Sequence, residues 1–336
     1  MPNEDRRIIM REIHFSAALA EAEIFEMERD PNIFIAGEDV SWGGSFGEYL
    51  KVKERFPERL FDTAITETAI AGLGLGSAIM GLRPILEFSF DDFMMVAADE
   101  IVNQIAKFSY MNGGKVKIPI VLSCNYGFGG GAAAQHSQSL EAMFAHIPGL
   151  KIVMPSNGAD AKGLMTAAIR DDNPVMFFNC VRLIGTKGHV PEGEYIVPIG
   201  KADIKKEGND VTIVSWGAMV LNALEAAEEL EKEGISAEVV DLRSLVPLDK
   251  ETVLESVKKT GRLVIAQTAV KKSGFGAEVA AVVAEEALDY LDAPIKRVGA
   301  PFCPVPFTPV LEKEYFVSPE KIVNAVKSLF DAVISA

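Results

Sequence analysis

One carboxylate stands where a catalytic acid or base could be shielded from water. The segment Thr66-Glu67-Thr68-Ala69-Ile70-Ala71-Gly72 places Glu67 at the start of a run of small and apolar residues that continues to Gly81. Such a run predicts a helix that is buried all round, and a buried carboxylate is rare unless it is paired or functional. The alternative is that Glu67 only complements the positive end of the helix dipole. The residues alone leave both interpretations open.

A glycine-rich segment carries a histidine. Gly129-Gly130-Gly131-Ala132-Ala133-Ala134-Gln135-His136-Ser137-Gln138 follows an expected strand at 118–123. Loops at the carboxyl ends of parallel strands are where α/β proteins place their chemistry, so His136 is a candidate proton donor or charge stabiliser. The alternative is an ordinary hydrogen-bonded loop histidine. His14, His146 and His189 have no comparable setting.

Two further segments suggest binding. In Glu87-Phe88-Ser89-Phe90-Asp91-Asp92-Phe93 the aromatic side chains can form a stacking surface for a planar ring, although core packing is the better explanation of this segment taken alone. In Ala168-Ile169-Arg170-Asp171-Asp172-Asn173-Pro174 the carbonyls of a helix end and the Asp and Asn oxygens can bind a hard monovalent cation. An ordinary helix-ending turn before Pro174 is the alternative.

A third glycine-rich stretch resembles a dinucleotide loop without being one. A G-x-G-x-x-G match beginning at Gly72 requires glycine at position 77, which is Ser77. The stretch also follows an expected helix start and not a strand end. Close helix packing is the better explanation of these glycines.

The elements that must position these residues alternate between strands and helices, which is typical of an α/β fold with mostly parallel sheets. The expected strands are 33–36, 83–87, 118–123, 151–154, 175–179, 211–215, 237–241, 263–265 and 295–298. The expected helices are 14–28, 68–80, 96–110, 159–170, 219–232, 250–260, 277–291 and 319–335. Gly, Pro, Lys and Glu accumulate at 185–207, which predicts a linker. We therefore expect two domains, 1–195 and 196–336.

Composition excludes several classes of protein. The chain has 336 residues and a formal net charge of −15, which argues against nucleic-acid and membrane-surface partners. The charge suits a basic protein partner or simply keeps the protein in solution. No apolar run approaches the ~18 residues that span a bilayer. The first seven residues lack a signal-like apolar stretch, and the three widely spaced cysteines suit a reducing compartment, so a cytoplasmic location is expected.

Together these segments resemble the β subunits of thiamine-diphosphate-dependent dehydrogenases, the first components of the pyruvate, branched-chain 2-oxo acid and acetoin dehydrogenase complexes. The likeness runs from about Arg11 to Leu329. Besides the segments around Glu67 and His136, it is carried by Gly37-Glu38-Asp39, Gly81-Leu82-Arg83-Pro84, Pro148-Gly149-Leu150-Lys151, Asp160-Ala161-Lys162-Gly163-Leu164, Ala168-Ile169-Arg170-Asp171 and Pro304-Val305-Pro306-Phe307. The family implies a transketolase-like pyrimidine-binding domain followed by a transketolase C-terminal-like domain.

The resemblance implies roles for single residues. Glu67 matches the residue that hydrogen-bonds a ring nitrogen of the cofactor's aminopyrimidine and so promotes removal of the thiazolium proton. Phe93 matches an aromatic lying against that ring, and His136 matches a histidine that steadies the substrate or lipoyl-linked intermediate. A structural potassium ion is implied at five positions: Ile120, Ala168, Ile169, Asp171 and Asn173.

One motif of thiamine enzymes is absent. They usually hold magnesium and diphosphate with Gly-Asp-Gly and a later Asn, whereas the nearest segment here is Gly208-Asn209-Asp210. The resemblance therefore implies that an α subunit holds the magnesium and completes the thiamine diphosphate site in an α2β2 heterotetramer. The second domain would serve dimerisation and docking onto a lipoyl-bearing acyltransferase core, whose docking domain is often basic.

Departures from the family leave the substrate open. Many relatives have an acidic pair where this chain has Ala266-Gln267-Thr268, and an acidic residue and a tyrosine around 179–184, where neither occurs here. Trp42-Gly43-Gly44 and the segment 304–311 look nearer to acetoin dehydrogenase β subunits. Two other functions stay under consideration: a split transketolase-like enzyme that transfers ketol units between sugars, and a scaffold subunit with a decayed site.

Overall fold

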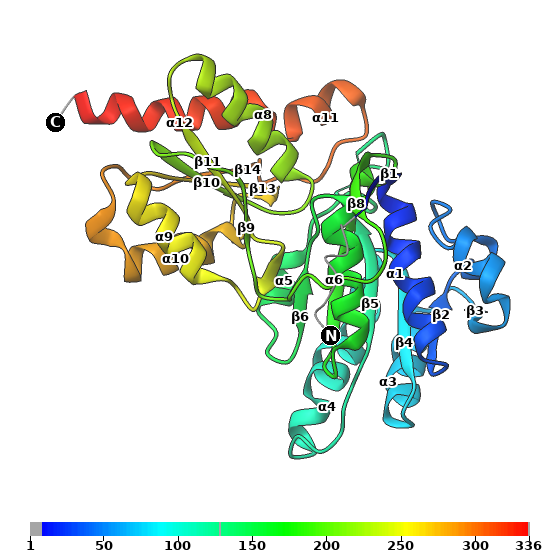
Figure 1. Ribbon diagram of the computed structural model, residues 1–336. Helices are drawn as coiled ribbons and strands as arrows, with labels where there is room; N and C mark the ends of the chain where they lie inside the picture. The colour runs from blue at the N-terminus through cyan, green and yellow to red at the C-terminus, as the bar shows by residue number, and fades with distance from the viewer. Residues whose placement is uncertain (1–8, 128, 335–336) are drawn as a thin grey trace, which may run out of the picture.

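Seven strands form the larger of the two main sheets, in the order β12-β6-β7-β5-β4-β2-β3. The computed structural model describes residues 9–127 and 129–334 (Figure 1). The strands of this sheet are β2 Ile33–Gly37, β3 Leu60–Asp62, β4 Arg83–Phe90, β5 Val121–Tyr126, β6 Lys151–Val153, β7 Val175–Cys180 and β12 Ser244–Val246. All neighbours are parallel except β12, which pairs antiparallel with β6. The carboxyl ends of six strands therefore meet at one edge.

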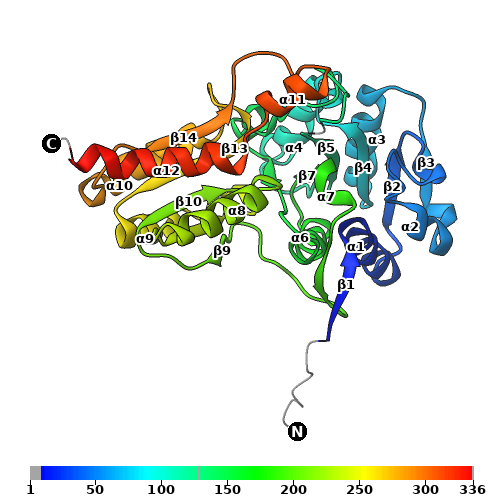
Figure 2. The same ribbon diagram turned by 90° about the horizontal axis from the view of Figure 1, so that it is seen from above.

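Helices cover both faces of this sheet (Figures 1 and 2). The helices α1 Phe15–Arg29 and α6 Gly158–Arg170 lie side by side on one face, and α3 Glu67–Ile79 and α4 Ala106–Met111 lie on the other. Shorter helices are α2 Leu50–Arg55, α5 Glu141–Ala145 and α7 Val181–Ile184, with 3-10 turns η1 Val40–Trp42, η2 Pro57–Arg59 and η3 Phe93–Met95. The strands β2, β5 and β7 are buried throughout, in keeping with their near-continuous apolar sequences.

A second sheet of five strands follows, in the order β14-β13-β10-β11-β9. Its strands are β9 Asp203–Lys206, β10 Val211–Ser215, β11 Ala237–Asp241, β13 Leu263–Val270 and β14 Lys296–Ala300. In Figure 1 the helices α8 Met219–Lys232 and α12 Pro319–Ile334 lie above it, and α9 Lys250–Thr260 and α10 Gly276–Glu286 lie below. The remaining elements are η5 Leu288–Tyr290 and α11 Pro309–Tyr315. The α/β class with two mostly parallel sheets is confirmed.

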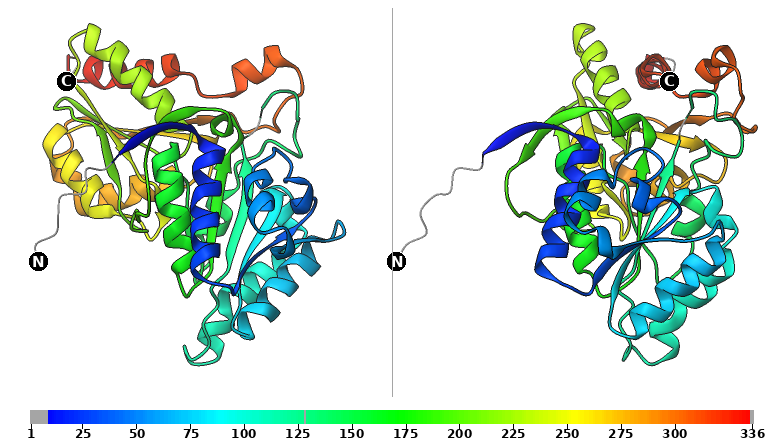
Figure 3. Two further views of the ribbon diagram at one scale, coloured as in Figure 1. Left: turned by 45° about the vertical axis from the view of Figure 1, so that its right-hand side comes forward. Right: turned by 90° about the vertical axis from the view of Figure 1, so that its right-hand side faces the viewer.

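The linker expected at 185–207 is wrong in part, because two strands lie within it. One is β8 Lys187–Pro191, which pairs antiparallel with β1 Met10–His14 in a ribbon beside α1 and α6 (Figure 3). The other is β9. Residue 195 falls in the segment between β8 and β9. The boundary there stays a prediction, and β12, which follows it in the chain, pairs with the first sheet.

The helix expected at 96–110 is interrupted. The described chain has the turn η3, then a π-helical segment, η4 Glu100–Ile105, and only then α4. The 3.6-residue spacing predicts one buried face with Val96, Ile101 and Ile105; Ile101 and Ile105 are buried, but Val96 is 60% exposed. A side-chain pattern alone does not distinguish π from α hydrogen bonding.

Two expectations concern the chain ends and membranes. The residues on which the absence of a signal sequence rests, 1–7, lie outside the described residues, as does residue 335 of the last expected helix. Among the described helices, none combines the length and apolar character needed to cross a bilayer.

Candidate functional site

The residues singled out by sequence lie at the carboxyl edge of the first sheet. Glu67 begins α3, Phe93 begins the 3-10 turn after β4, and His136 lies in the loop after β5. The Phe93 and His136 rings stand edge to face, with their centroids 5.0 Å apart, and the Phe90 ring lies 5.3 Å from His136. The structure thus brings Phe93 and His136 together in one aromatic wall.

Glu67 is 8% exposed, which fits the expectation of a shielded carboxylate. The expectation that its helix is buried all round is wrong for the chain by itself, because Leu73 and Ile79 of α3 are 44% and 41% exposed. Among the described residues, no hydrogen bond or ion pair occupies its carboxylate. A buried carboxylate that keeps its acceptor sites free is suited to accept a hydrogen bond from a bound ring. Glu67 also lies at the positive end of the α3 dipole, so the alternative that it only complements this dipole stays open.

A second carboxyl near Glu67 was missed by the sequence analysis. Burial, and then the negative charges of Glu67 and Asp39, raise the pKa of the half-buried Glu38. Glu38 directly follows β2, whose carboxyl end lies at the same edge of the sheet as the aromatic wall. Its position after a buried parallel strand was the available signal.

Two aspartates hold the loop that carries His136. The backbone N–H of Leu140 donates to Asp91 Oδ2 at 2.8 Å, and Gln138 Nε2 donates to Asp92 Oδ1 at 2.6 Å. Asp91 is fully buried, and burial together with the charge of Asp92 raises its pKa well above the usual range. The sequence analysis placed both aspartates in the aromatic segment but gave them no role.

The second domain supports the other end of the same loop. The backbone N–H of Gly131 donates to Glu312 Oε1 at 2.9 Å, and Glu312 lies in α11. The loop is therefore fixed from both domains, which limits the positions that His136 can take.

The glycines of α3 divide into two sets. A Cβ on Gly74 would lie 2.2 Å from Leu86 Cδ1, so this glycine allows α3 to pack closely on β4, as expected. Gly72 and Gly76 are exposed, and a Cβ on either would meet no atom of the described chain within 4 Å. Packing inside the chain does not explain these two.

Four residues of the expected potassium site lie at the end of α6 and in the turn that follows it: Ala168, Ile169, Asp171 and Asn173. The fifth, Ile120, precedes β5, and its carbonyl accepts the N–H of Val175, two residues after Asn173, at 2.9 Å. The carbonyls of Ile169 and Asp171 accept hydrogen bonds from Arg83 Nη2 at 2.8 and 2.7 Å.

Arg83 Nε also donates to the Ile169 carbonyl at 2.9 Å, so the guanidinium takes both acceptor positions of that oxygen, whereas among the described residues the Ile120 and Asp171 carbonyls each keep one position that a hard monovalent cation could use. The other two expected ligands are close by, since the Ala168 carbonyl accepts the N–H of Asp171 and the Asn173 N–H donates to Asp171 Oδ1. An ion here would share the Ile169 and Asp171 carbonyls with the Arg83 guanidinium. In the described part of the chain, this turn included, no group of three or more His, Cys, Asp or Glu side chains could hold a metal ion.

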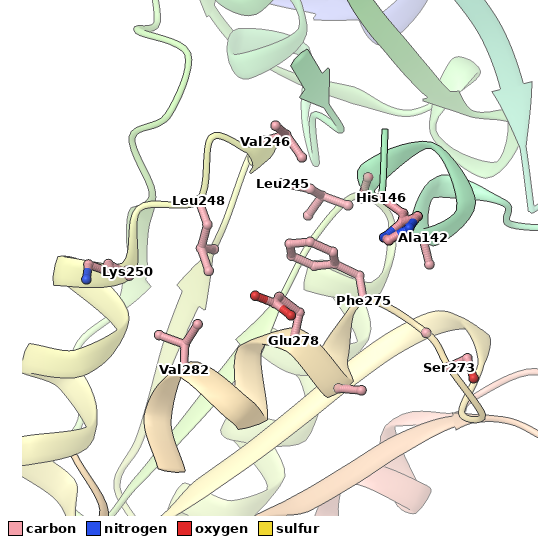
Figure 4. Close-up of a pocket in the computed structure, with 13 residues that line it drawn as sticks. Ala142, His146, Leu245, Val246, Leu248, Lys250, Ser273, Phe275, Glu278 and Val282 are labelled. Carbon is pink, nitrogen blue, oxygen red and sulfur yellow. The ribbon is translucent and has the colours of Figure 1, made fainter. Parts of the chain in front are cut away.

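A cleft of about 550 Å³ opens between α5 and α10, away from these residues (Figure 4). His146, Phe275 and Glu278 lie around it in the close-up, and Leu245 and Val282 contribute apolar walls. None of the expected site residues lines it. The cleft is therefore distinct from the aromatic wall formed by Phe93 and His136.

The departure at 266–268 has a local explanation. Gln267 is 2% exposed, its Oε1 accepts the N–H of Gly276 at the start of α10, and its Nε2 donates to the Val270 carbonyl at 2.8 Å. A carboxylate at this position could accept the first hydrogen bond but could not donate the second. The amide therefore anchors α10 on β13.

Two protein families match the two halves of the chain. Residues 11–185 match the transketolase pyrimidine-binding domain, and residues 200–322 match the transketolase C-terminal domain. A solved structure of a split-gene transketolase, described as an inactive β4 tetramer, aligns with a TM-score of 0.77 and 28% identity over 95% of this chain and 98% of that chain.

Curated relatives are closer in sequence. The β subunit of Bacillus subtilis acetoin:2,6-dichlorophenolindophenol oxidoreductase is 47% identical, covering 95% of this chain and 97% of its own. The β subunit of 2-oxoisovalerate dehydrogenase from the same organism is 48% identical, covering 90% and 94%. The β subunit of the Rickettsia bellii pyruvate dehydrogenase E1 component is 46% identical, covering 93% and 97%. The chain therefore belongs to the family of β subunits of thiamine-diphosphate-dependent 2-oxo acid and acetoin dehydrogenases.

Proposed function

We propose that Glu67, Phe93 and His136 form this chain's share of a thiamine diphosphate site, and that an α subunit provides the rest. The observation that carries the proposal is the buried Glu67 carboxylate, which has no partner among the described residues and lies at the same sheet edge as the Phe93–His136 wall. Thiamine diphosphate supplies the carbon nucleophile that attacks the carbonyl of a 2-oxo acid or of acetoin.

Glu67 holds a proton at a ring nitrogen of the aminopyrimidine. The carboxylate is suited to this because it is shielded from water, fixed on the first turn of a helix and free to accept the hydrogen bond. Glu38 lies within electrostatic reach of Glu67, since burial and then the charge of Glu67 raise the pKa of Glu38.

The aromatic wall orients the reacting groups. Phe93 offers an apolar face to the aminopyrimidine ring, and the Phe90 ring, 5.5 Å from Phe93, supports it from behind. His136 stands at the substrate side of this wall, where its ring nitrogens can donate to or accept from the substrate or the lipoyl-linked acyl group. The acyl unit then passes to the lipoyl group of an acyltransferase core.

The exposed face of α3 supports the proposal of an α subunit partner. Ala69, Gly72, Leu73, Gly76 and Met80 form an uncharged stripe on this face. Small residues at such spacing allow the backbone of another helix to approach closely. The α subunit would cover this stripe and hold the magnesium and diphosphate beside Glu67, in an α2β2 heterotetramer.

A substitution of Glu67 tests the assignment. Glu67→Gln keeps the size of the side chain but replaces the carboxylate with a neutral amide, so the variant should fold and assemble normally while losing most of the exchange of the thiazolium proton for deuterium. The exchange is followed by NMR after acid quench of the reconstituted α–β enzyme. Near-normal exchange in Glu67→Gln would rule out the proposed role.

The potassium site is a second proposal, supported by the carbonyl oxygens that converge on the turn at 168–173. If it binds potassium, the thermal midpoint of the isolated chain should be higher in potassium chloride than in choline chloride at equal ionic strength. Arg83→Leu should remove the competing guanidinium without removing the carbonyls. Equal midpoints in both salts, for both proteins, would contradict the site.

Ketol transfer between sugars is the second candidate function, favoured by the match to a split-gene transketolase. Its identity of 28% is well below the 46–48% of the dehydrogenase subunits. Lipoyl-independent turnover of sugar phosphates by the reconstituted pair would support it. The scaffold alternative predicts instead that no α partner confers thiamine diphosphate binding.

The relatives do not distinguish between the possible substrates, because the β subunits of pyruvate, 2-oxoisovalerate and acetoin enzymes have nearly the same sequence identity to this chain. We assign the chain to the cytoplasm, in keeping with the bacterial sources of these relatives. Docking of the second domain onto the acyltransferase core is likewise a proposal, supported by the net charge of −15.

A further inference from the structure

The end of β4 contains an unusual bend. Glu87 pairs with Ser123 of β5, but the next pair joins Phe90 to Asn125, so β4 has one residue more than β5 over this stretch. Ser89 lies in the bend with a φ of 56°, in the left-handed region that residues with a Cβ seldom adopt. The bend is a β-bulge at a strained serine, and such strain persists only where the surroundings impose it.

Side chains around the bulge hold Ser89 from three directions. Glu87 Oε1 accepts the Ser89 N–H at 2.9 Å, Asn125 Nδ2 donates to the Ser89 carbonyl at 2.8 Å, and Ser45 Oγ lies 3.2 Å from Ser89 Oγ. Glu87 is itself fixed, because Tyr49 donates its hydroxyl to Oε2 at 2.6 Å. Both backbone polar groups of the strained residue are therefore satisfied by buried side chains.

The bulge decides where the aromatic side chains point. Successive side chains of a regular strand alternate between the two faces of the sheet, and one extra residue reverses that alternation. Phe88, before the bend, is buried in the core, whereas Phe90, after it, contacts both Phe93 and His136. Without the bulge, Phe90 would turn away from His136.

Burying a carboxyl group at position 87 carries a desolvation cost. Glu87 is 3% exposed, and the described residues that line the cavity beside it include the carboxyl groups of Glu23 and Glu48 but no basic side chain. Burial and then the charge of Glu48 raise the pKa of Glu87 to about 8. An apolar side chain of similar size would avoid this desolvation cost.

We propose that Glu87 is a positioning residue of the active site, whose carboxyl group holds the Ser89 bulge and thereby sets the Phe90 ring against His136. This inference rests on the proposed function, which places Phe93 and His136 in the site. Glu87 acts through the backbone of Ser89 and touches neither the cofactor nor the substrate.

A pair of substitutions tests this mechanism. Glu87→Ala removes the acceptor, so kcat of the reconstituted enzyme should fall about tenfold or more, because sub-ångström displacement of reacting groups is costly. Adding Ser89→Gly should restore most of the loss, since glycine adopts a positive φ without strain and needs the acceptor less. Ser89→Gly alone should leave kcat near the wild-type value.

Two further variants separate this effect from general loss of structure. Glu23→Gln alters the same cavity without a bond to Ser89 and should leave kcat unchanged. If Glu87→Ala does not fold, Glu87→Gln replaces it. Glu87→Gln retains an oxygen that can accept the Ser89 N–H, and should keep kcat near wild type while Glu87→Met, which has no such acceptor, loses about tenfold.

A structural measurement is independent of activity. In crystals of the cofactor-free chain, the Phe90–His136 ring separation, now 5.3 Å, should widen in Glu87→Ala and return in the double variant. An unchanged separation, or an activity loss that Ser89→Gly does not restore, would overturn the inference. If the wild-type pair lacks activity with thiamine diphosphate, the proposed function fails, whereas the ring displacement still tests Glu87.

Discussion

At the scale of single residues, the carboxyl groups around the site differ in what they touch. Glu67 keeps its acceptor sites free, Glu87 is occupied by Ser89 and Tyr49, and Asp91 by the backbone of Leu140. A free buried carboxylate suits proton exchange with a ligand, while an occupied one suits the positioning of backbone. This difference in hydrogen bonding separates the proposed catalytic role of Glu67 from the positioning roles.

The raised pKa of Glu87 predicts how stability depends on pH. The folded chain keeps the Glu87 proton up to about pH 8, whereas the unfolded chain releases it near the ordinary glutamate pKa of 4.5. The folded state thus binds more protons between these values, so the free energy of unfolding should fall as pH rises from about 4.5 to 8. Glu23 and Glu48 face the same cavity, and burial raises their pKa values too.

Replacing Glu87 by Gln should flatten this dependence. The variant should gain thermal stability relative to wild type at pH 8.5 and gain less at pH 5.5, as measured by calorimetry in buffers of equal ionic strength. The exposed Glu58 provides a control, since Glu58→Gln should leave the pH profile in place. A Glu87→Gln profile parallel to that of the wild type would contradict the assignment.

Part of the site could be predicted from the sequence. The local pattern marked Glu67, at the start of an apolar helix, and His136, in a glycine-rich loop, whereas Phe93 was singled out of its aromatic cluster by the family resemblance. Glu38, Asp91 and Glu312 could not be given roles, since their partners are distant in sequence. Glu312, for example, bonds Gly131, and only the packing of the second domain brings them together.

At the scale of elements, two sides of α3 carry glycines, and they differ in what packs against them. Gly74 packs on Leu86 within the chain, and Gly72 and Gly76 face outward. The expectation of close helix packing is thus confirmed for Gly74. The other two glycines are explained within the proposed function by the approach of the α subunit.

Matched substitutions in α3 distinguish these two sides. Gly74→Ala should lower the free energy of unfolding by about 1–3 kcal/mol, because its Cβ would overlap Leu86, whereas Gly72→Ala should be neutral or slightly stabilising. Urea unfolding of the isolated chain measures both. Gly72→Leu should leave that stability intact yet prevent assembly with the α subunit, as followed by analytical ultracentrifugation. Normal assembly of Gly72→Leu would exclude this face as the interface.

Local sequence pattern predicted most of the helices and strands. The exceptions depend on pairing with segments that are distant in the sequence. The alternation of apolar strands and helices predicted both main sheets. The strand β12 is only three residues long and pairs with β6, about ninety positions earlier in the chain, so no local signal marks it. The β1–β8 ribbon likewise joins segments far apart in sequence.

At the scale of the whole molecule, the two domains share the support of one loop. Asp91 and Asp92 fix its carboxyl-terminal part from the first domain, and Glu312 fixes Gly131 from the second. The His136 loop therefore depends on the relative placement of both sheets. The chain nevertheless lacks the Gly-Asp-Gly segment by which thiamine enzymes hold magnesium and diphosphate.

The central claim is that this chain holds one half of a shared site, and calorimetric titration tests it most directly. Magnesium and thiamine diphosphate are titrated into this chain alone, into an α subunit containing Gly-Asp-Gly alone, and into their equimolar mixture. Only the mixture should bind the cofactor tightly, at one site per α–β pair, because neither chain alone supplies both ends of the site. Tight, stoichiometric binding by this chain alone would contradict the account.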